Sequence, residues 1–490
     1  MASTTLIDAS AKLPTPPGGE PPRHEDLYAK RKQIYPKLAH GKFRTVKWIV
    51  MAVTLGIYYG LPWLRWNRGE GVPDQAVLAD FASEKFYFFF IELWPQDIHF
   101  MAGGLILAAL LLFLVTSLLG RVWCGYTCPQ TVWTDLYIWV ERAFEGDRAA
   151  RMRLDKAPWS FNKLSRKLGK HVVWLVIAFW TGGAFILYWH DAPTVAAGWF
   201  KGEAPLTAYW FAGILTLTTY FLAGTMREQV CTYMCPWPRI QGALTDEQAL
   251  NVTYRYDRGE PRGPKRKSEN WDERGDCIDC NQCVQVCPMG IDIRDGEQLE
   301  CIHCALCIDA CDEMMVKIGR PKGLIAYDTQ LAVAARNAGQ TPPKHKIIRA
   351  RTLLYAVVMT VIGVLMVWGL ATKSTLEANV LKDRSPPYVL LSDGRIQNGY
   401  TLKLVNKASE PRTMLLDVTG LDALSFKVIG MEHDGGDTLE LPVEAFGVDR
   451  YRILVAAEAG APRRQVTFTV KDAETGEADV NVSSFRGAEQ

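Results

Sequence analysis

The sequence has little excess of charge of either sign. Its 490 residues include 55 lysines and arginines against 53 aspartates and glutamates, which gives a formal net charge of +2. Proteins that bind nucleic acid carry a clear basic excess because they must neutralise phosphates. The composition therefore predicts no nucleic-acid partner.

The chain also has little overall hydrophobicity, with a mean hydropathy of -0.03. This excludes a transporter that lies wholly within the membrane. The apolar residues are nevertheless gathered in long runs separated by polar stretches, which excludes a simple cytosolic enzyme. Five runs approach the ~20 residues that cross a bilayer, so we expect about five transmembrane α-helices. These runs are residues 48–64, 101–119, 172–188, 208–223 and 353–371.

Lysine and arginine are unevenly distributed among the loops. They are dense in residues 30–47, 142–170 and 344–351 and sparse in the loops after the first and third runs. Because basic loops remain on the cytoplasmic side, we expect the N-terminus inside and the C-terminus outside. The first run starts too late to be a cleaved signal peptide, so it is predicted to be an anchor.

These patterns divide the chain into five predicted parts. A proline-rich disordered cytoplasmic tail covers residues 1–45, and a four-helix membrane region covers residues 46–251. Within that region, residues 86–94 are predicted to be interfacial or re-entrant, and residues 131–144 to form an amphipathic helix on the membrane surface. The remaining parts are a cytoplasmic Cys-dense domain with its linkers (252–350), the fifth transmembrane helix (351–372) and an outside domain (373–490).

The outside domain has no cysteine, which excludes stabilisation by disulfides. Its apolar residues alternate with period two in short segments separated by turn signals such as Asn398-Gly399. About seven such segments in about 100 residues predict an immunoglobulin-like β-sandwich. The segments are residues 400–406, 413–418, 425–430, 438–443, 451–456, 465–470 and 479–485.

Eight of the 12 cysteines form two runs with the spacing C-x2-C-x2-C-x3-C. This spacing is typical of two-cluster bacterial ferredoxins with an α+β fold, in which the fourth cysteine of each run ligates the other cluster. Zinc ribbons and disulfides are the alternatives, but they use other spacings or another compartment. One predicted 4Fe-4S ligand set is Cys277, Cys280, Cys283 and Cys311, and the other is Cys301, Cys304, Cys307 and Cys287.

Two details accompany these runs. Pro288 follows the first run, whereas Asp312 stands at the matching place after the second, which is predicted to alter the surroundings of that cluster without changing a ligand. His303 lies between two ligands and is predicted to be a solvent-side neighbour.

The remaining four cysteines lie in two copies of the motif C-x-Y-x-C-P, one after the second apolar run and one after the fourth. Proline disfavours helical geometry in the residue before it, and it can start the next helix. A thiol at a helix start is expected to have a lowered pKa. Four such thiols could hold Cu(I), another iron–sulfur centre or an exchangeable dithiol pair, and the alternative is apolar packing. The four are Cys124, Cys128, Cys231 and Cys235.

Each motif also carries a tyrosine, Tyr126 or Tyr233. Either one could lie between the thiols and the ferredoxin domain or serve as an interfacial side chain. All 12 cysteines fall on the predicted reducing side, which favours redox metal chemistry over disulfides.

The combination of the two C-x-Y-x-C-P motifs, the double ferredoxin run and the outside sandwich resembles the cytochrome c oxidase accessory proteins of the FixG, RdxA or CcoG type. The resemblance covers nearly the whole chain beyond the tail. It implies a multi-pass protein of the bacterial inner membrane with two 4Fe-4S clusters. It also implies an oxidoreductase that reduces Cu(II) to Cu(I) during maturation of a cbb-type oxidase. The four membrane-edge cysteines then become candidates for copper binding and for the reduction step.

The implied partners are the lipid bilayer, a cytoplasmic electron donor or quinol, copper ions with a copper chaperone or exporter, and factors that assemble the oxidase. Two alternatives remain open at this point. One is a quinol-oxidising electron-transfer component of the nitrate or nitrous oxide reductase type. The other is a non-enzymatic scaffold whose outside sandwich docks oxidase subunits.

Overall fold

The computed structural model describes residues 33–69, 71–264, 274–408, 410–421, 423–431, 438–458 and 463–487. The chain divides into two compact units between Val364 and Leu365. Most of the predicted disordered tail lies outside the described residues. Its described part, residues 33–45, lies in the first unit: residues 42–45 begin α1, and the Tyr35 hydroxyl donates to Asp155 at 2.7 Å. That part of the predicted tail therefore belongs to the folded unit.

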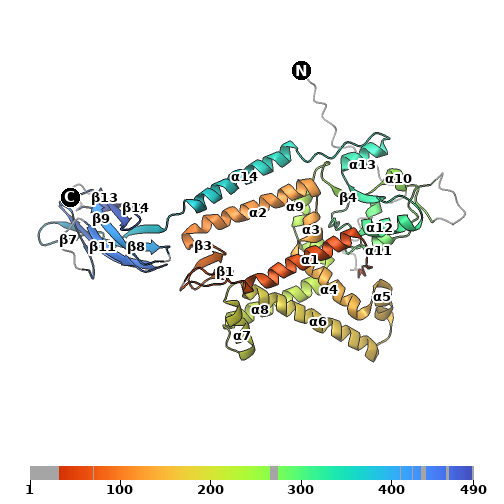
Figure 1. Ribbon diagram of the computed structural model, residues 1–490, viewed down its shortest axis with the longest axis horizontal. Coiled ribbons are helices and arrows are strands. Elements are labelled where there is room, and N and C mark those ends of the chain that lie inside the picture. Colours follow the sequence, from red (N-terminus) through yellow and green to blue (C-terminus); the bar gives the residue numbers. More distant parts are fainter. Residues whose placement is uncertain are drawn as a thin grey trace, which may run out of the picture. The chain divides into compact units, whose positions relative to one another are not determined.

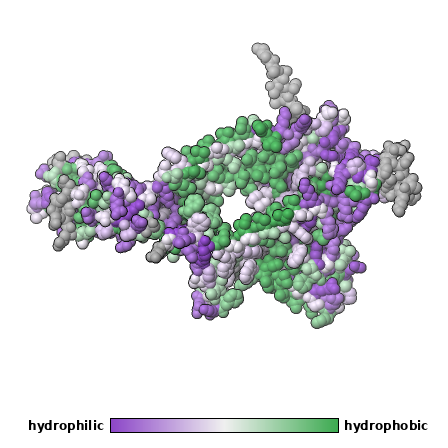
Figure 2. All heavy atoms as spheres, viewed as in Figure 1, coloured by the Kyte–Doolittle hydropathy of each residue, from purple (hydrophilic) through white to green (hydrophobic). Residues whose placement is uncertain are grey.

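Five helices among the described residues are long and apolar enough to cross a membrane, at the places of the five predicted runs. In the last of these helices, no residue of the most apolar stretch is buried within the protein. In the second helix, 11% of the most apolar stretch is buried. Figure 2 shows the resulting hydrophobic surface over these two helices. A bilayer removes such a surface from water. The five are α1 Lys42–Gly60, α2 Ile98–Leu119, α6 Phe161–Ile186, α8 Leu206–Thr219 with its π-helical extension η3 Tyr220–Met226, and α14 Ala350–Ala371.

The segment after α1 forms a small antiparallel sheet of three strands, β1 Val77–Asp80, β2 Lys85–Phe88 and β3 Ile91–Leu93. Residues 86–94, predicted to be interfacial or re-entrant, form the paired strands β2 and β3. Their aromatic residues favour the pleated conformation.

Helix α4 Pro129–Glu145 is present where an amphipathic helix is predicted over residues 131–144. Its polar face, however, is buried against cations. Glu141 lies 2.9 Å from Arg151 and 2.5 Å from Arg227. Burial opposes ionisation of Glu141, but the neighbouring cations outweigh it and lower the pKa of the carboxyl. Helix α4 packs against α5 Arg148–Lys156, α6 and η3. Removing one partner of such a buried ion pair is strongly destabilising, so these pairs fix the position of α4.

The ferredoxin segment is built around an antiparallel pair, β4 Asn251–Tyr254 and β5 Ile325–Asp328, with helices α11 Gln282–Val286 and α12 Leu306–Lys317. It is joined to the first membrane helix, as Figure 1 shows for α12 and α1. Asp309 accepts hydrogen bonds from the backbone N–H groups of Phe43 (3.2 Å) and Arg44 (2.7 Å). A carboxylate there satisfies the orphan donors of the helix start, which fixes the segment on α1.

Shorter elements complete the first unit. They are η1 Leu61–Trp63, η2 Pro95–Asp97, α3 Val122–Tyr126, α7 Ala192–Lys201, η4 Val230–Met234, α9 Trp237–Leu244, α10 Tyr256–Gly259, η5 Ile293–Asp295 and α13 Gln330–Asn337.

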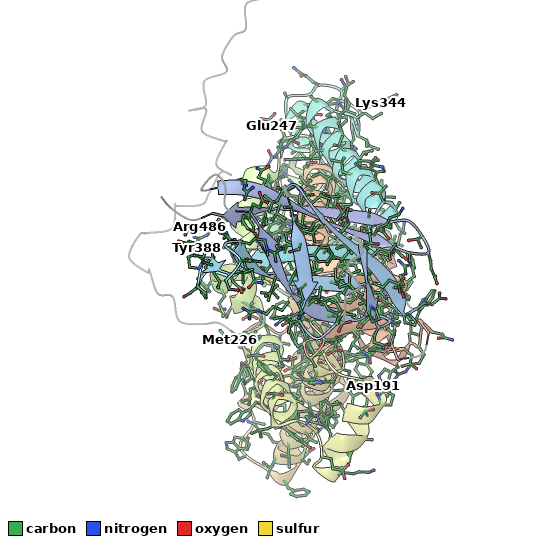
Figure 3. All side chains as sticks on the ribbon, turned by 90° about the vertical axis from the view of Figure 1, so that its left-hand side faces the viewer. Asp191, Met226, Glu247, Lys344, Tyr388 and Arg486 are labelled. Carbon is green, nitrogen blue, oxygen red and sulfur yellow. The ribbon has the colours of Figure 1, made fainter. Side chains whose placement is uncertain are left out.

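The second unit is a sandwich of two antiparallel sheets. One has the order β10-β12-β8-β6, with β7 also paired to β8, and the other the order β11-β9-β13-β14. Tyr400 and Phe468 meet at 5.0 Å between ring centres in the core between the sheets. Figure 3 labels Tyr388 and Arg486 at one edge, where Asn398 exchanges two hydrogen bonds with the backbone of Arg486.

Every predicted segment of the sandwich contains a strand. The strands are β8 Ile396–Asn406, β9 Arg412–Thr419, β10 Ser425–Val428, β11 Thr438–Val443, β12 Val448–Ala457, β13 Arg463–Asp472 and β14 Ala478–Arg486. The structure adds β6 Leu376–Lys382 and β7 Val389–Leu390, which sequence reasoning missed. Only part of β6 alternates in burial, which weakens the period-two signal.

Candidate metal centres

Each C-x-Y-x-C-P motif begins with a short helical turn that carries its first cysteine. Cys124 lies in α3, and Cys231 lies in the π-helical turn η4, and each turn is five residues long. Gly120, with a φ of 57°, ends α2 just before α3. Its left-handed conformation, which glycine adopts readily, turns the chain out of the membrane helix and into the motif.

The second cysteine of each motif leaves the helical geometry. Cys128 has φ and ψ of -56° and 127°, and Cys235 has -81° and 123°. Both precede a proline, which disfavours the helical region for the residue before it. The predicted effect of the proline is confirmed, and Pro129 is the first residue of α4.

The four membrane-edge thiols lie near enough to one another to interact electrostatically. The thiol of Cys124 interacts electrostatically with those of Cys128, Cys231 and Cys235, and that of Cys231 with Cys128 and Cys235. Burial raises the pKa of both Cys124 and Cys231 to about 12. Among the described residues, no three His, Cys, Asp or Glu side chains are close enough to ligate a single metal ion.

Two further contacts hold this arrangement. The Cys124 thiol donates to the side-chain oxygen of Gln241 on α9 at 3.1 Å. Gln130, two residues after Cys128, donates to the backbone carbonyls of Leu222 and Arg227 at the end of the fourth membrane helix. Each motif is thus tied to the chain that carries the other.

The structure groups the first predicted ferredoxin ligand set around one cavity. Cys277, Cys280, Cys283 and Cys311 all line it. The Cys311 thiol interacts electrostatically with the other three. Cys311 comes from α12, which continues through Asp312 because no proline stops it, and Asp312 accepts a hydrogen bond from the Gly323 N–H at 2.8 Å.

The second predicted set surrounds a neighbouring cavity. Cys287, Cys301, Cys304 and Cys307 line it, together with Cys283 of the first set. The Cys307 thiol interacts electrostatically with all four of these cysteines. The fourth cysteine of each run therefore lies with the first three cysteines of the other run, as the spacing predicts.

The loops that carry the cysteines repeat the same backbone conformation. Asp279 and Asn281 have φ of 52° and 55°, and His303 and Ala305, at the matching positions, have 52° and 60°. These left-handed residues curl each loop tightly, which aims successive thiols at one point. Eight soft sulfur ligands in two such cavities fit two iron–sulfur clusters.

The first membrane-edge motif is docked directly on the second ferredoxin run. A side chain at Gly125 would place its Cβ 2.6 Å from the Ile302 carbonyl oxygen and 3.0 Å from the Cα of Cys304. The hydroxyl of Tyr126 donates to the Cys304 carbonyl at 3.1 Å. Cys124, Cys304 and Cys307 accordingly belong to one apolar core.

The prediction that His303 is a solvent-side neighbour is wrong. Its side chain is 2% exposed, and its Nδ1 accepts a hydrogen bond from the backbone N–H of Arg121 at 3.0 Å. Burial and the nearby Arg121 guanidinium lower the pKa of His303 to about 3. The histidine is covered because the motif after α2 lies on the cluster loop, which local sequence could not indicate.

The two tyrosines of the motifs differ in burial. Tyr126 is buried between the thiols and the ferredoxin segment, as one of the two sequence hypotheses holds, whereas 77% of Tyr233 is exposed.

Sequence reasoning also missed Arg121 and Gln241, both of them buried beside Cys124. The signal available for Arg121 was a charge placed directly between a membrane helix and a cysteine motif.

Three family models match the chain. A 4Fe-4S dicluster domain matches residues 226–330, which include the second motif and both ferredoxin runs. A 4Fe-4S binding domain matches residues 101–145, which include the first motif. The model described as the IG-like fold at the C-terminal of FixG matches residues 366–488.

The curated relatives match at nearly full length. Nitrogen fixation protein FixG from Rhizobium meliloti is 48% identical over 489 residues, which covers 94% of this chain and 93% of the relative. The chain belongs to the FixG/RdxA family. Two members from Cereibacter sphaeroides are equally similar. RdxB is 47% identical with 94% of this chain and 97% of RdxB covered, and RdxA is 48% identical with 89% and 92% covered.

Membership of the FixG/RdxA family agrees with the five apolar helices and the 4Fe-4S domains. The chain is a membrane protein of the iron–sulfur electron-transfer type with a C-terminal immunoglobulin-like domain.

Proposed function

We propose that this FixG/RdxA protein carries electrons through its two ferredoxin sites to the membrane-edge thiols and there reduces Cu(II) to Cu(I), in the maturation of a cbb-type cytochrome c oxidase. Bound 4Fe-4S clusters supply one-electron redox chemistry. Cu(II) is the substrate, and it takes up the electron that a cytoplasmic donor or a quinol delivers to the clusters.

The observation that carries the proposal is the shared core of Cys124, Cys304 and Cys307. It supports a continuous arrangement of sulfur ligands from the ferredoxin segment to the membrane edge. The two ferredoxin cavities have Cys283 in common, which supports transfer between them. The second-run site is therefore assigned as the proximal one and the first-run site as the distal one.

Two surrounding residues fix the ferredoxin segment against the first membrane-edge motif. Arg121 donates to the carbonyls of Leu299 and Pro238, so one guanidinium joins the ferredoxin segment to the start of α9. Gln241 fixes the Cys124 thiol from the other side. Soft thiol ligands suit Cu(I), the product of the reduction, better than Cu(II), so the site favours the reduced metal.

The basic loops support a placement in the bacterial inner membrane with the ferredoxin segment cytoplasmic and the C-terminal domain periplasmic. On this placement copper is reduced inside, before a copper chaperone or exporter takes it onward. The C-terminal domain is then available to factors that assemble the oxidase.

The test replaces all four membrane-edge cysteines by alanine in the full chain. The variant is expected to lose Cu(II) reduction, followed with a chelator specific for Cu(I) after reduction of the protein. The ferredoxin EPR signals should remain, because the eight ferredoxin cysteines are untouched. Thr232→Ala, in the same turn η4 as Cys231, is the matched control and should reduce Cu(II) normally.

Copper reduction at the parental rate in the four-cysteine variant would overturn the proposal. Reduction of the clusters by menaquinol under anaerobic conditions would identify a quinol as the electron source. If the quinol reduces the clusters and neither protein reduces Cu(II), the quinol-oxidising alternative replaces the proposal.

A further inference from the structure

Two cations are buried where α1 begins, beside the ferredoxin segment. Arg44 is 4% exposed and Lys47 is 3% exposed. Both lie near one carboxylate oxygen of Asp135 on α4, the Arg44 Nη1 at 2.8 Å and the Lys47 Nζ at 3.9 Å. Burying a charge costs free energy unless an opposite charge compensates it. At this point one carboxylate compensates two buried cations.

Arg142 adds a third cation to this group. It follows Asp135 by about two turns of α4, so the two residues share a face of the helix. Its acidic neighbour Asp147 lies 3.6 Å away and is 45% exposed, so water screens that pair. Burial, together with the nearby guanidinium of Arg44, lowers the pKa of Arg142 to about 10. The cation cluster of Arg44, Lys47 and Arg142 is therefore short of negative charge.

Several polar atoms of the cation cluster are buried without a hydrogen-bond partner among the described residues. They are Nε and Nη2 of Arg44, Nε and Nη1 of Arg142, and Oδ2 of Asp135. A buried polar group costs free energy until a partner satisfies it. A phosphate supplies acceptor oxygens for guanidinium groups together with the missing negative charge. A hydroxyl group beside that phosphate supplies the donor that Asp135 lacks.

The cation cluster lies at the level of a membrane interface. The guanidinium of Arg44 stacks over the Trp48 ring, 4.8 Å from its centre, and Trp48 is 40% exposed. Tryptophan is enriched where membrane helices pass the lipid headgroups. Figure 2 shows the hydrophobic surface of α1 ending where the hydrophilic surface of the ferredoxin segment begins. Lipid phosphates occupy this level of a bilayer.

Helix α1 also has a shallow groove that leads away from the cation cluster. Ala52, Gly56 and Gly60 continue the row of Arg44 and Trp48 at intervals of four residues, and all three are exposed. A Cβ at Gly56 or Gly60 would meet no atom within 4 Å. The apolar ridge beside this row consists of Ile49, Val53 and Ile57, each more than half exposed. Residues four apart lie on one side of a helix, so the small residues leave room for an acyl chain.

We propose that the chain binds an anionic phospholipid with a hydroxyl-bearing headgroup, of the phosphatidylglycerol type, between the start of α1 and α4. The phosphate accepts hydrogen bonds from Arg44 and Arg142, and Lys47 contributes positive charge. A headgroup hydroxyl donates to Asp135, and one acyl chain lies in the groove of α1.

The bound lipid also strengthens the contact between the membrane helices and the ferredoxin segment. Asp309 of that segment accepts a hydrogen bond from the backbone N–H of Arg44 at 2.7 Å, so a ligand that holds Arg44 holds this contact too. The lipid lies in the leaflet on the side of the ferredoxin segment. The inference does not depend on the proposed copper chemistry, because none of the membrane-edge cysteines enters it.

The test uses the full chain with its iron–sulfur clusters, stripped of lipid in detergent. Dioctanoyl phosphatidylglycerol, dioctanoyl phosphatidylcholine and inorganic phosphate are added separately, and the temperature at which the cluster absorbance bleaches is measured. A ligand that binds only the folded protein raises this temperature. We expect phosphatidylglycerol to raise it by a few degrees, and the other two to leave it nearly unchanged. Equal shifts with phosphatidylcholine, a shift with inorganic phosphate alone, or no shift at all overturn the proposal.

Two variants separate the headgroup contacts from the groove. Arg142→Gln should raise the concentration of phosphatidylglycerol for half of the shift by about 10- to 100-fold, because hydrogen bonds to a charged group are lost. Gly56→Leu fills the groove without meeting other atoms and should also weaken binding, by a smaller factor. Arg153→Gln, at an exposed position of α5, is the matched control and should bind like the parental protein. Unchanged binding in Arg142→Gln overturns the headgroup assignment, and unchanged binding in Gly56→Leu overturns the groove assignment.

A purely structural role of Arg142 gives a different result. Without lipid, Arg142→Gln should bleach at the parental temperature or above it, because a buried, poorly compensated charge is removed. If the lipid-free variant bleaches at a lower temperature and phosphatidylglycerol shifts it as it shifts the parental protein, Arg142 only supports the fold and the proposal fails.

Discussion

The two C-x-Y-x-C-P motifs are nearly identical in sequence, but the fold uses them differently. The first motif lies against the ferredoxin run, with Gly125 and Tyr126 in contact with the loop from Ile302 to Cys304. The second exposes Tyr233, 77% of which faces away from the protein. A repeated motif can therefore supply equivalent ligands while only one copy makes the connection to the rest of the protein.

Two positions account for the difference. Thr232 stands where the first motif has Gly125, and a backbone that approaches a loop as closely as Gly125 does has no room for a side chain. Three residues before the first cysteine, Arg121 stands in one motif and Glu228 in the other. Arg121 opposes, and Glu228 adds to, the rise in the pKa of the neighbouring thiol.

The largest effect is expected for Gly125→Val. The new side chain meets backbone atoms of Ile302 and Cys304, which cannot move aside without distorting the cluster loop. Overpacking of this kind costs about 1–3 kcal/mol, or roughly 5- to 150-fold in the equilibrium between docked and undocked motif. The rate of Cu(II) reduction by the pre-reduced protein, followed with a chelator specific for Cu(I), should fall accordingly.

Thr232→Val is the matched change in the second motif. It keeps a β-branched side chain and should leave the rate nearly unaltered. Equal slowing in both variants would show that the two motifs contribute alike to the connection, contrary to the comparison.

An intermediate effect is expected for His303→Ala. The backbone N–H of Arg121 loses its acceptor and stays buried, which costs about 1–3 kcal/mol. The temperature at which the cluster absorbance bleaches should fall, and limited proteolysis after Arg121 should become faster. His303→Asn, which keeps an acceptor near this place, should recover part of the loss. An unchanged bleaching temperature in His303→Ala would contradict a docking role for this contact.

The smallest effect is expected for Tyr126→Phe. The variant loses one hydrogen bond to the Cys304 carbonyl, which contributes about 1 kcal/mol. Tyr233→Phe removes an exposed hydroxyl and should change stability by less than about 0.5 kcal/mol. Both are measured by the same thermal bleaching. A larger shift for Tyr233→Phe than for Tyr126→Phe would reverse the comparison between the two motifs.

Much of the architecture could be predicted from local pattern. Apolar runs predicted the five membrane helices, and alternation predicted the sandwich strands from β8 to β14. Aromatic residues 86–94 were harder, because an apolar aromatic stretch fits a membrane interface and a strand equally well until its hydrogen-bond partners are known. Strand β6 gave too little alternation to be recognised.

The candidate sites show the same division. The spacing of the ferredoxin cysteines predicted which thiols gather in each cavity, since a tight loop leaves few alternatives. His303 and Arg121 could not be paired from sequence, because 182 residues separate them.

The sequence by itself determined the two ferredoxin thiol sets and the extended conformation of the cysteines that precede a proline, Cys128, Cys235 and Cys287. Both depend on neighbours within a few residues, namely the short gaps between cysteines and the proline that follows. Only the tertiary structure decided which motif meets the ferredoxin run. That choice depends on close packing between distant segments, where the missing side chain of Gly125 and the buried contact of His303 with Arg121 make room for one copy and hold it in place.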